Sequence, residues 1–111
     1  MLPAKYKLSP LQIPFVARKG RKYPGKRFDI KVVQEDLLNF PKVAISVSVK
    51  VSKKAVVRNR IKRVLREAIR LLIVEDKLPN AKYLIVLKSA TVSEDTPADL
   101  VSELSSQLKL D

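Results

Sequence analysis

The chain has 111 residues, of which 23 are Lys or Arg and 11 are Asp or Glu, so its formal net charge is +12. It contains no Cys and no His, which excludes a disulfide framework, a thiolate metal site and the general base that is commonest near neutral pH. So large a positive excess destabilises a compact domain unless a polyanion screens it, which favours nucleic acid as a partner over an anionic membrane.

The length fits one domain with one hydrophobic core. We therefore predict a single domain over residues 1–111. Pro3, Pro10 and Pro14 oppose a long regular helix near the N-terminus, so residues 1–14 are expected to form a loose, flexible arm. The sequence shows no signal-peptide core and no run of transmembrane length. These features favour a cytoplasmic protein without a membrane partner.

The first half of the chain alternates between turn and strand signals. A short helix is expected around residues 11–19, and a basic turn over 18–27 contains both glycines. FDIKVV (28–33) and KVAISVSVKV (42–51) alternate in the manner of strands. One face of the second run carries Val and Ile, while the other is small and polar, with Ala44, Ser46, Ser48 and Lys50. A further strand is expected before residue 28.

The second half switches to helical spacing. Apolar residues recur with a helical period over 55–74, and KYLIVLK (82–88) has the length and composition of a buried strand. Thr96 followed by Pro97 and Asp99 predicts a helix start with a capping box. This order of elements predicts an α+β sandwich in which helices pack against a small sheet.

The helix over 55–74 separates charge from apolar surface. On a wheel of about 100° per residue, its apolar side chains gather in one arc of about 120°, formed by Val57, Ile61, Val64, Leu65, Ala68, Leu71 and Leu72. Beside this arc runs a basic ridge at i, i+4 spacing, formed by Arg58, Lys62, Arg66 and Arg70. Arg60 lies on the opposite flank, close to Glu67, so it either contacts a partner from a second direction or pairs with an acid.

The charge pattern favours RNA as the polyanion. Residues 50–70 hold nine basic side chains and one acid, whereas an ordinary solvated helix mixes signs because like charges at i, i+4 repel. Arg dominates, and its planar fork suits phosphates and unpaired bases. Three acid pairs are interpreted as turn or helix-end residues, so we predict no catalytic or metal-binding residue in the chain: Glu35-Asp36, Glu75-Asp76 and Glu94-Asp95.

The run AISVSVKVSKKAVVRNRIKRVLREAIR (44–70) resembles the signature of the bacterial ribonuclease P protein subunit. In that family a strand leads through a Lys-rich turn to an Arg-Asn-Arg element on a helix, here Arg58, Asn59 and Arg60. The chain departs from the pattern in two places. Lys53 stands where Gly is common, and the aromatic positions of the family's first helix hold Ile13 and Ala17.

The resemblance implies a more specific fold than the residues alone. It implies an αβββαβα order in a two-layer sandwich, similar to RNA-binding domains of ribosomal and translocase proteins. It also implies a left-handed βαβ crossover, which in this chain would comprise residues 43–50, 55–73 and 82–88, against the general preference for the right hand.

The resemblance implies the protein subunit of a ribonucleoprotein that removes the 5′ leader of precursor tRNA. The RNA subunit would be the catalyst and would hold most of the Mg²⁺ ions, and no protein partner would be required. The positions expected to bind the RNA subunit are Lys53, Lys54, Arg58, Asn59, Arg60, Lys62, Arg63, Arg66 and Arg70. The positions expected to line a cleft for the leader are Phe15, Arg18, Ser46, Ser48 and Lys50.

One alternative function stays open on the sequence. A ribosomal protein, or another structural protein that binds rRNA, has the same need for a small basic domain. Such a protein would bind rRNA but would confer no cleavage on an added catalytic RNA.

Overall fold

The structure, a computed structural model, describes residues 2–35 and 37–109. In this part of the chain four strands form one mixed sheet in the order β1-β2-β4-β3. They are β1 (Arg21–Tyr23), β2 (Phe28–Gln34), β3 (Lys42–Ser46) and β4 (Ala81–Leu87). The strand expected before residue 28 is thus β1, inside the segment interpreted as a basic turn.

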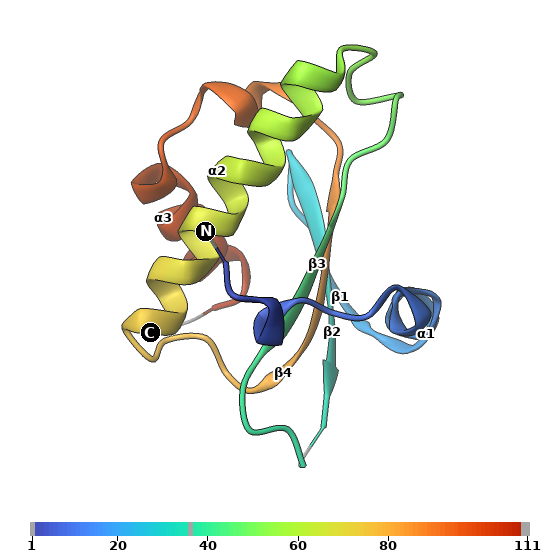
Figure 1. Ribbon diagram of the computed structural model, residues 1–111, viewed down its shortest axis with the longest axis vertical. Coiled ribbons are helices and arrows are strands. Elements are labelled where there is room, and N and C mark those ends of the chain that lie inside the picture. Colours follow the sequence, from blue (N-terminus) through green and yellow to red (C-terminus); the bar gives the residue numbers. More distant parts are fainter. Residues whose placement is uncertain (1, 36, 110–111) are drawn as a thin grey trace.

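Helices lie on both faces of the sheet. The long helix α2 (Ala55–Val74) and the C-terminal helix α3 (Pro97–Gln107) cover one face, and the short helix α1 (Ile13–Lys19) lies on the other (Figure 1). The described residues also form three short 3₁₀ turns, two before α1 (Ala4–Tyr6 and Pro10–Gln12) and one between β4 and α3 (Ala90–Glu94). The α+β sandwich predicted from the sequence is confirmed, with α1 as a partial cover on the second face.

The pairing of β3 with β4 defines the βαβ unit. These strands are parallel, with Val43 opposite Tyr83 and Ser46 opposite Val86, while β2 is antiparallel to both β1 and β4. The connection between β3 and β4 contains α2, as expected for parallel neighbours. The left hand of this crossover stays a prediction.

Strand β3 is shorter than its alternating sequence predicted. It ends at Ser46, and Ser48 begins a turn in which the N–H of Val51 donates to the Ser48 carbonyl at 3.0 Å. Val49, expected on the apolar face, is 63% exposed. The chain must leave the sheet here to reach the start of α2, and β3 pairs with β4 no farther than Val86. Ser48 and Lys50 therefore belong to the turn and not to the sheet.

Helix α2 occupies the predicted range and packs on the sheet through one side. Its buried residues are Ile61, Leu65, Ala68, Ile69 and Leu72. Ile69 lies outside the predicted apolar arc, and Leu71 of that arc is only half-buried. Because α3 and the 3₁₀ turn at Ala90–Glu94 also contact α2, the buried surface is broader than a single sheet contact requires.

The start of α3 has the predicted capping box. The Asp99 N–H donates to the Thr96 hydroxyl at 3.3 Å, and the Thr96 N–H donates to the Asp99 carboxylate at 3.1 Å. Pro97 occupies the first turn, where it costs no hydrogen bond.

The N-terminal segment expected to be a loose arm packs against the domain over residues 2–8. Leu2 is 3% exposed within the main core and Leu8 is 5% exposed on the second face. The Leu8 N–H donates to the Val43 carbonyl at 2.9 Å, so the segment covers part of the free edge of β3. Burial of two leucines offsets the cost of ordering the segment.

Candidate nucleic-acid interface

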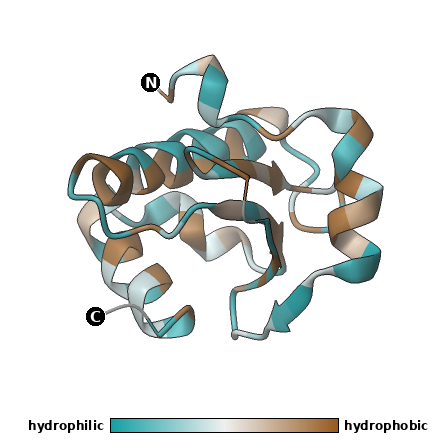
Figure 2. Cartoon of the chain, turned by 90° about the horizontal axis from the view of Figure 1, so that it is seen from below, coloured by the Kyte–Doolittle hydropathy of each residue, from teal (hydrophilic) through white to brown (hydrophobic). Residues whose placement is uncertain are grey.

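The outer side of α2 carries cations without acidic partners. Arg60, Arg63 and Arg66 are exposed and Lys62 is half-buried. Within residues 2–35 and 37–109 none of these four side chains makes an ion pair. The helix therefore presents positive charge that no described acid neutralises. Hydrophilic and hydrophobic residues alternate along α2 (Figure 2). Such a surface suits a polyanion.

Arg58 has a structural role as well as a charge. Its Nη1 donates to the Ser52 carbonyl at 2.8 Å, and the side chain is partly buried. The same turn is closed by the Lys54 N–H donating to the Ser52 hydroxyl at 3.2 Å. Arg58 thus fastens the segment before α2 to the first turn of the helix and keeps its remaining guanidinium nitrogens available.

Arg70, the last member of the basic ridge, is partly neutralised. Its Nε donates to the Glu67 carboxylate at 2.9 Å. The Arg70 guanidinium lowers the pKa of Glu67, because the hydrogen bond favours the charged carboxylate. The ridge residues without an acidic partner in the described chain are therefore Arg58, Lys62 and Arg66.

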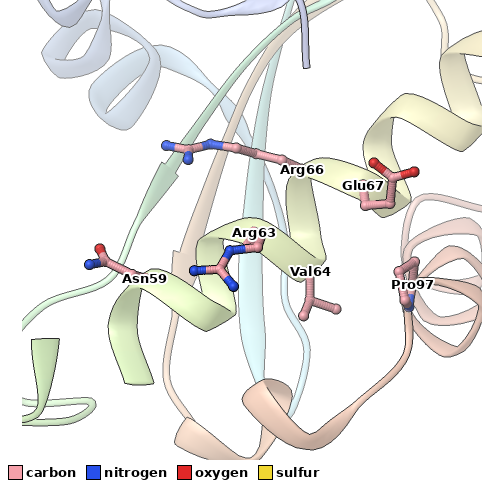
Figure 3. Close-up of a pocket in the computed structure, with 6 residues that line it drawn as sticks. All are labelled: Asn59, Arg63, Val64, Arg66, Glu67 and Pro97. Carbon is pink, nitrogen blue, oxygen red and sulfur yellow. The ribbon is translucent and has the colours of Figure 1, made fainter. Parts of the chain in front are cut away.

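A groove follows the middle of α2. Its volume is about 740 Å³, and it is lined by Asn59, Arg63, Val64, Arg66, Glu67 and Pro97. In Figure 3 Asn59, Arg63 and Arg66 extend to one side of α2, whereas Glu67 lies toward α3 and Pro97. The groove thus has a polar and cationic side, while its single acid, Glu67, lines the side toward Pro97.

The turn before α2 extends the positive surface beyond the helix. Lys50, Lys53 and Lys54 are exposed and unpaired within the described residues, and the turn lies at the end of the molecule reached by the green segment in Figure 1. Lys54 occupies the N-cap position, and its side chain makes no capping hydrogen bond there. The turn and α2 together carry the nine residues expected to bind the RNA subunit, of which Arg58 and Arg70 also bond within the chain.

The five residues expected to line the leader cleft do not all come together. Ser46 is exposed at the end of β3, opposite Val86. Phe15, which is 40% exposed, lines a hollow of about 410 Å³ with Lys82 at the start of β4. Lys82 and Val86 are four residues apart, or about 13 Å along a strand. Phe15 and Ser46 therefore lie at opposite ends of the sheet.

The remaining cleft positions are surface residues. Arg18 is exposed on α1, and Ser48 and Lys50 lie in the turn after β3. Ala44, on the same face as Ser46, packs against the small cluster beneath α1 that contains Leu8 and Val16. The small-residue face of the sheet is thus beside α1, where the family resemblance implied a cleft between this face and the first helix.

Sequence reasoning missed basic residues of the N-terminal segment. Lys7 shares a hollow of about 170 Å³ with Arg66 of the basic ridge and Ala44 of β3. Lys5 is two residues before Lys7, in the 3₁₀ turn Ala4–Tyr6, and Lys42 is two residues before Ala44, at the start of β3. The two lysines of AKYK (4–7) are visible in the sequence. Because this segment was expected to be flexible, there was no reason in the sequence to place them beside α2.

These features define a small, strongly basic α+β domain with a cationic surface suited to RNA. The sequence profile of the family Ribonuclease P matches residues 2–110. The ribonuclease P protein component of Rippkaea orientalis is 36% identical over 104 residues, covering 90% of this chain and 80% of the relative. That of a Pseudanabaena strain is 32% identical, covering 84% of this chain and 78% of the relative.

Solved structures have the same fold. The Staphylococcus aureus RNase P protein aligns with a TM-score of 0.76 at 21% identity, covering 94% of this chain and 93% of that chain. The RNase P protein from Thermotoga maritima gives a TM-score of 0.76 at 18% identity, covering 93% and 94%. The chain belongs to the ribonuclease P protein family. It is therefore part of an endoribonuclease complex that acts in tRNA processing, with ribonuclease P RNA as its partner, and the ribosomal alternative is not favoured.

No helix in the described part of the chain is long and apolar enough to cross a membrane. The cytoplasmic location stays a prediction.

Proposed function

We propose that this chain binds the catalytic RNA of ribonuclease P through α2 and the preceding turn, and assists the Mg²⁺-dependent removal of the 5′ leader from precursor tRNA. The observation that carries the proposal is the row of cations on α2 that have no acidic partner in the described residues: Arg60, Lys62, Arg63 and Arg66. Bringing two RNAs together requires that their phosphate repulsion be screened, and this surface supplies the charge.

The chemistry of cleavage is assigned to the RNA subunit. The described residues offer no group of three Asp, Glu, His or Cys side chains that could hold a metal ion. Mg²⁺, held mainly by the RNA, would activate the attacking water. The contribution of the protein is to raise the affinity for substrate and for these ions by screening phosphates.

The leader is assigned to the side of the sheet where β3 ends. Ser46, Ser48 and Lys50 are exposed there, and Arg18 is exposed on the neighbouring α1. Hydroxyls and cations of this kind suit a single strand, whose phosphates and bases are both accessible. Phe15 lines the hollow at the other end of the sheet. It contributes to leader binding only if the RNA leader runs along the sheet from Ser46 to that hollow.

Reconstitution with a bacterial ribonuclease P RNA tests the proposal. The protein is expected to stimulate cleavage of precursor tRNA at low Mg²⁺. Arg60→Ala and Arg63→Ala should each weaken binding to the RNA by roughly tenfold, lower the steepness of its salt dependence by about one, and leave the melting temperature unchanged. Lys26→Ala, which removes an exposed cation from the β1–β2 turn, is the matched control. It should change the RNA affinity by no more than about twofold and leave the steepness of the salt dependence nearly unchanged.

The same reconstituted holoenzyme can be used to test the proposed leader contacts. Lys50→Gln should weaken binding of precursor tRNA, which carries the leader, more than binding of mature tRNA, which lacks it. The preference of the holoenzyme for precursor tRNA should therefore fall. Absence of stimulation by the unmodified protein, together with unchanged RNA affinity in both arginine variants, would falsify the proposed function.

A further inference from the structure

Two lysines and two aromatic rings form a surface patch where the N-terminal segment meets the start of β3. The rings of Tyr6 and Phe40 meet edge to face with their centroids 5.8 Å apart. Lys5 Nζ lies 5.0 Å from the centroid of Tyr6 and 5.7 Å from that of Phe40, and Lys42 Nζ lies 5.7 Å from that of Phe40. We call these four residues the aromatic–lysine patch.

The patch combines the two chemical features that single-stranded RNA requires. Both rings are half-buried, which fixes their orientation while part of each stays accessible. Neither lysine makes an ion pair in the part of the chain that the structure describes, although Asp76 lines a hollow of about 160 Å³ that also contains Tyr6 and Phe40. Unpaired bases stack on aromatic rings while neighbouring cations hold the phosphates.

The patch is continuous with the basic surface of α2. Lys7 follows Tyr6 directly and shares a hollow of about 170 Å³ with Arg66. The path from α2 therefore runs through Arg66 and Lys7, across the edge of β3, to Lys5 and Lys42. The Leu8 N–H bonded to the Val43 carbonyl holds this segment at the sheet edge, so the patch has a fixed place relative to the helix.

We propose that the aromatic–lysine patch is a second contact site for the ribonuclease P RNA, which it binds through an unpaired stretch whose bases stack on Phe40 and Tyr6. The RNA subunit is the occupant, and not the tRNA leader, because the patch continues the α2 surface. The sheet end where Ser46 emerges is four residues farther along β3 than Lys42. This inference rests on the proposed function of the α2 surface.

Equilibrium binding of a bacterial ribonuclease P RNA at a series of salt concentrations tests the patch. Lys5→Gln/Lys42→Gln should weaken binding by on the order of tenfold and lower the steepness of the salt dependence by about 0.7 per lysine. Phe40→Leu keeps the apolar bulk and should weaken binding by a similar factor without changing the salt dependence, because stacking releases no counterions.

Control variants separate this inference from loss of fold and from the proposed function. Lys26→Gln/Lys109→Gln removes the same charge from the β1–β2 turn and the end of α3 and should leave both quantities nearly unchanged. Melting temperatures within about 2 °C of the unmodified protein exclude unfolding.

Each outcome has one meaning. If Arg63→Ala weakens RNA binding while folded patch variants bind like the control, the patch is not a contact site and the proposed function stands. If the patch variants lose affinity only for precursor tRNA in the holoenzyme, the occupant is the leader and the inference is overturned. If Arg63→Ala also has no effect, the proposed function itself fails.

Discussion

Arg58 and Arg63 are both helix arginines, yet their surroundings give them different roles. Arg58 reaches back to the Ser52 carbonyl at 2.8 Å and is half-buried, whereas Arg63 is exposed and bonded to no described residue. A charged hydrogen bond to a carbonyl contributes about 1 kcal/mol when partly solvated. The same residue type therefore acts on the fold at one position and is free for RNA at the other.

Replacing each arginine by Gln separates these roles. Arg58→Gln should lower the free energy of unfolding by about 1 kcal/mol and also weaken RNA binding, since the lysines of the turn lose their fixed position. Arg63→Gln should weaken RNA binding without changing stability. Urea denaturation together with RNA titration checks both, and equal stability of the two variants would contradict the assignment of Arg58.

Phe15 lies apart from the residues with which it was grouped, while its part in leader binding stays a prediction. It was grouped with Ser46, Ser48 and Lys50 through resemblance to a family, but nothing in the local sequence gives the direction in which an α1 side chain points across a sheet. The register places Lys82, the neighbour of Phe15, and Val86, the partner of Ser46, at different ends of β4. Such long-range geometry depends on how strands align and is absent from single-residue patterns.

At the scale of elements, one arginine ties the beginning of β2 to the C-terminal part of the chain. Arg27 Nη1 donates to the Asp95 carboxylate at 3.0 Å, and the guanidinium also binds Glu103 of α3. Both carboxylates raise the pKa of Arg27, while the hydrogen bonds from Arg27 lower the pKa of Asp95. This cluster explains why Arg27, unlike the cations of α2, is not available to a polyanion.

The lowered pKa of Asp95 predicts a loss of stability in acid. A carboxyl group whose pKa is depressed on folding stabilises the native state above its unfolded pKa of 3.8, and this contribution is lost as the pH falls through the folded pKa. Asp95→Asn should therefore lower the melting temperature by several degrees at pH 7. The difference from the unmodified protein should shrink as the pH falls below about 4.

Glu94→Gln is the matched control for this experiment. Glu94 is exposed and adjacent in sequence, and it is bonded to no described residue. Its replacement should shift the melting temperature little at any pH. A difference between Asp95→Asn and the unmodified protein that is independent of pH would show that charge is not the cause.

The ends of a helix or strand could be predicted only where the hydrogen bonds of that element lie within its own sequence. Helix α2 occupies the predicted residues because its hydrogen bonds are internal and its apolar period is uninterrupted. Strand β3 stops at Ser46, although alternation continues to Val51, because a strand needs a partner and β4 pairs with β3 no farther than Val86. Local alternation shows which residues suit a strand, while pairing determines which of them form one.

At the scale of the whole molecule, the net charge of +12 acts on stability as well as on binding. Without RNA, excess positive charge repels itself more strongly in the compact state than in the unfolded chain. Salt screens such repulsion over about 10 Å at 0.1 M. The seven described ion pairs would be weakened by salt, but 23 cations against 11 acids make repulsion dominate.

The melting temperature should consequently rise by several degrees between about 20 and 300 mM sodium chloride. Lys53→Glu/Lys62→Glu removes four units of charge, which takes the formal value from +12 to +8, and should reduce the rise. Scanning calorimetry at both salt concentrations measures the effect. A melting temperature that falls with salt would indicate that attractive pairs outweigh the repulsion.

The overall architecture was more predictable than the packing of the chain ends. Alternation, caps and charge placed most elements, and the order of elements then limited the possible sheets. The attachment of residues 2–8 was not predicted, because its contacts involve Leu2 and Leu8 singly, without a period. Burial of isolated leucines depends on cavities that exist only after the rest of the domain has folded.

The two faces of the sheet are held by cores of very different size. Among the described residues, the face beneath α2 and α3 belongs to a cluster of eighteen buried residues, whereas the face beneath α1 has three: Leu8, Val16 and Leu84. Less apolar area means a smaller free energy for local opening. We therefore expect a hierarchy within one fold, in which α1 can separate from the sheet while α2 keeps its position. Under the proposed function, the face that stays closed would hold the ribonuclease P RNA, and the face that opens would meet the leaders of different precursor tRNAs on the opposite side of the same sheet.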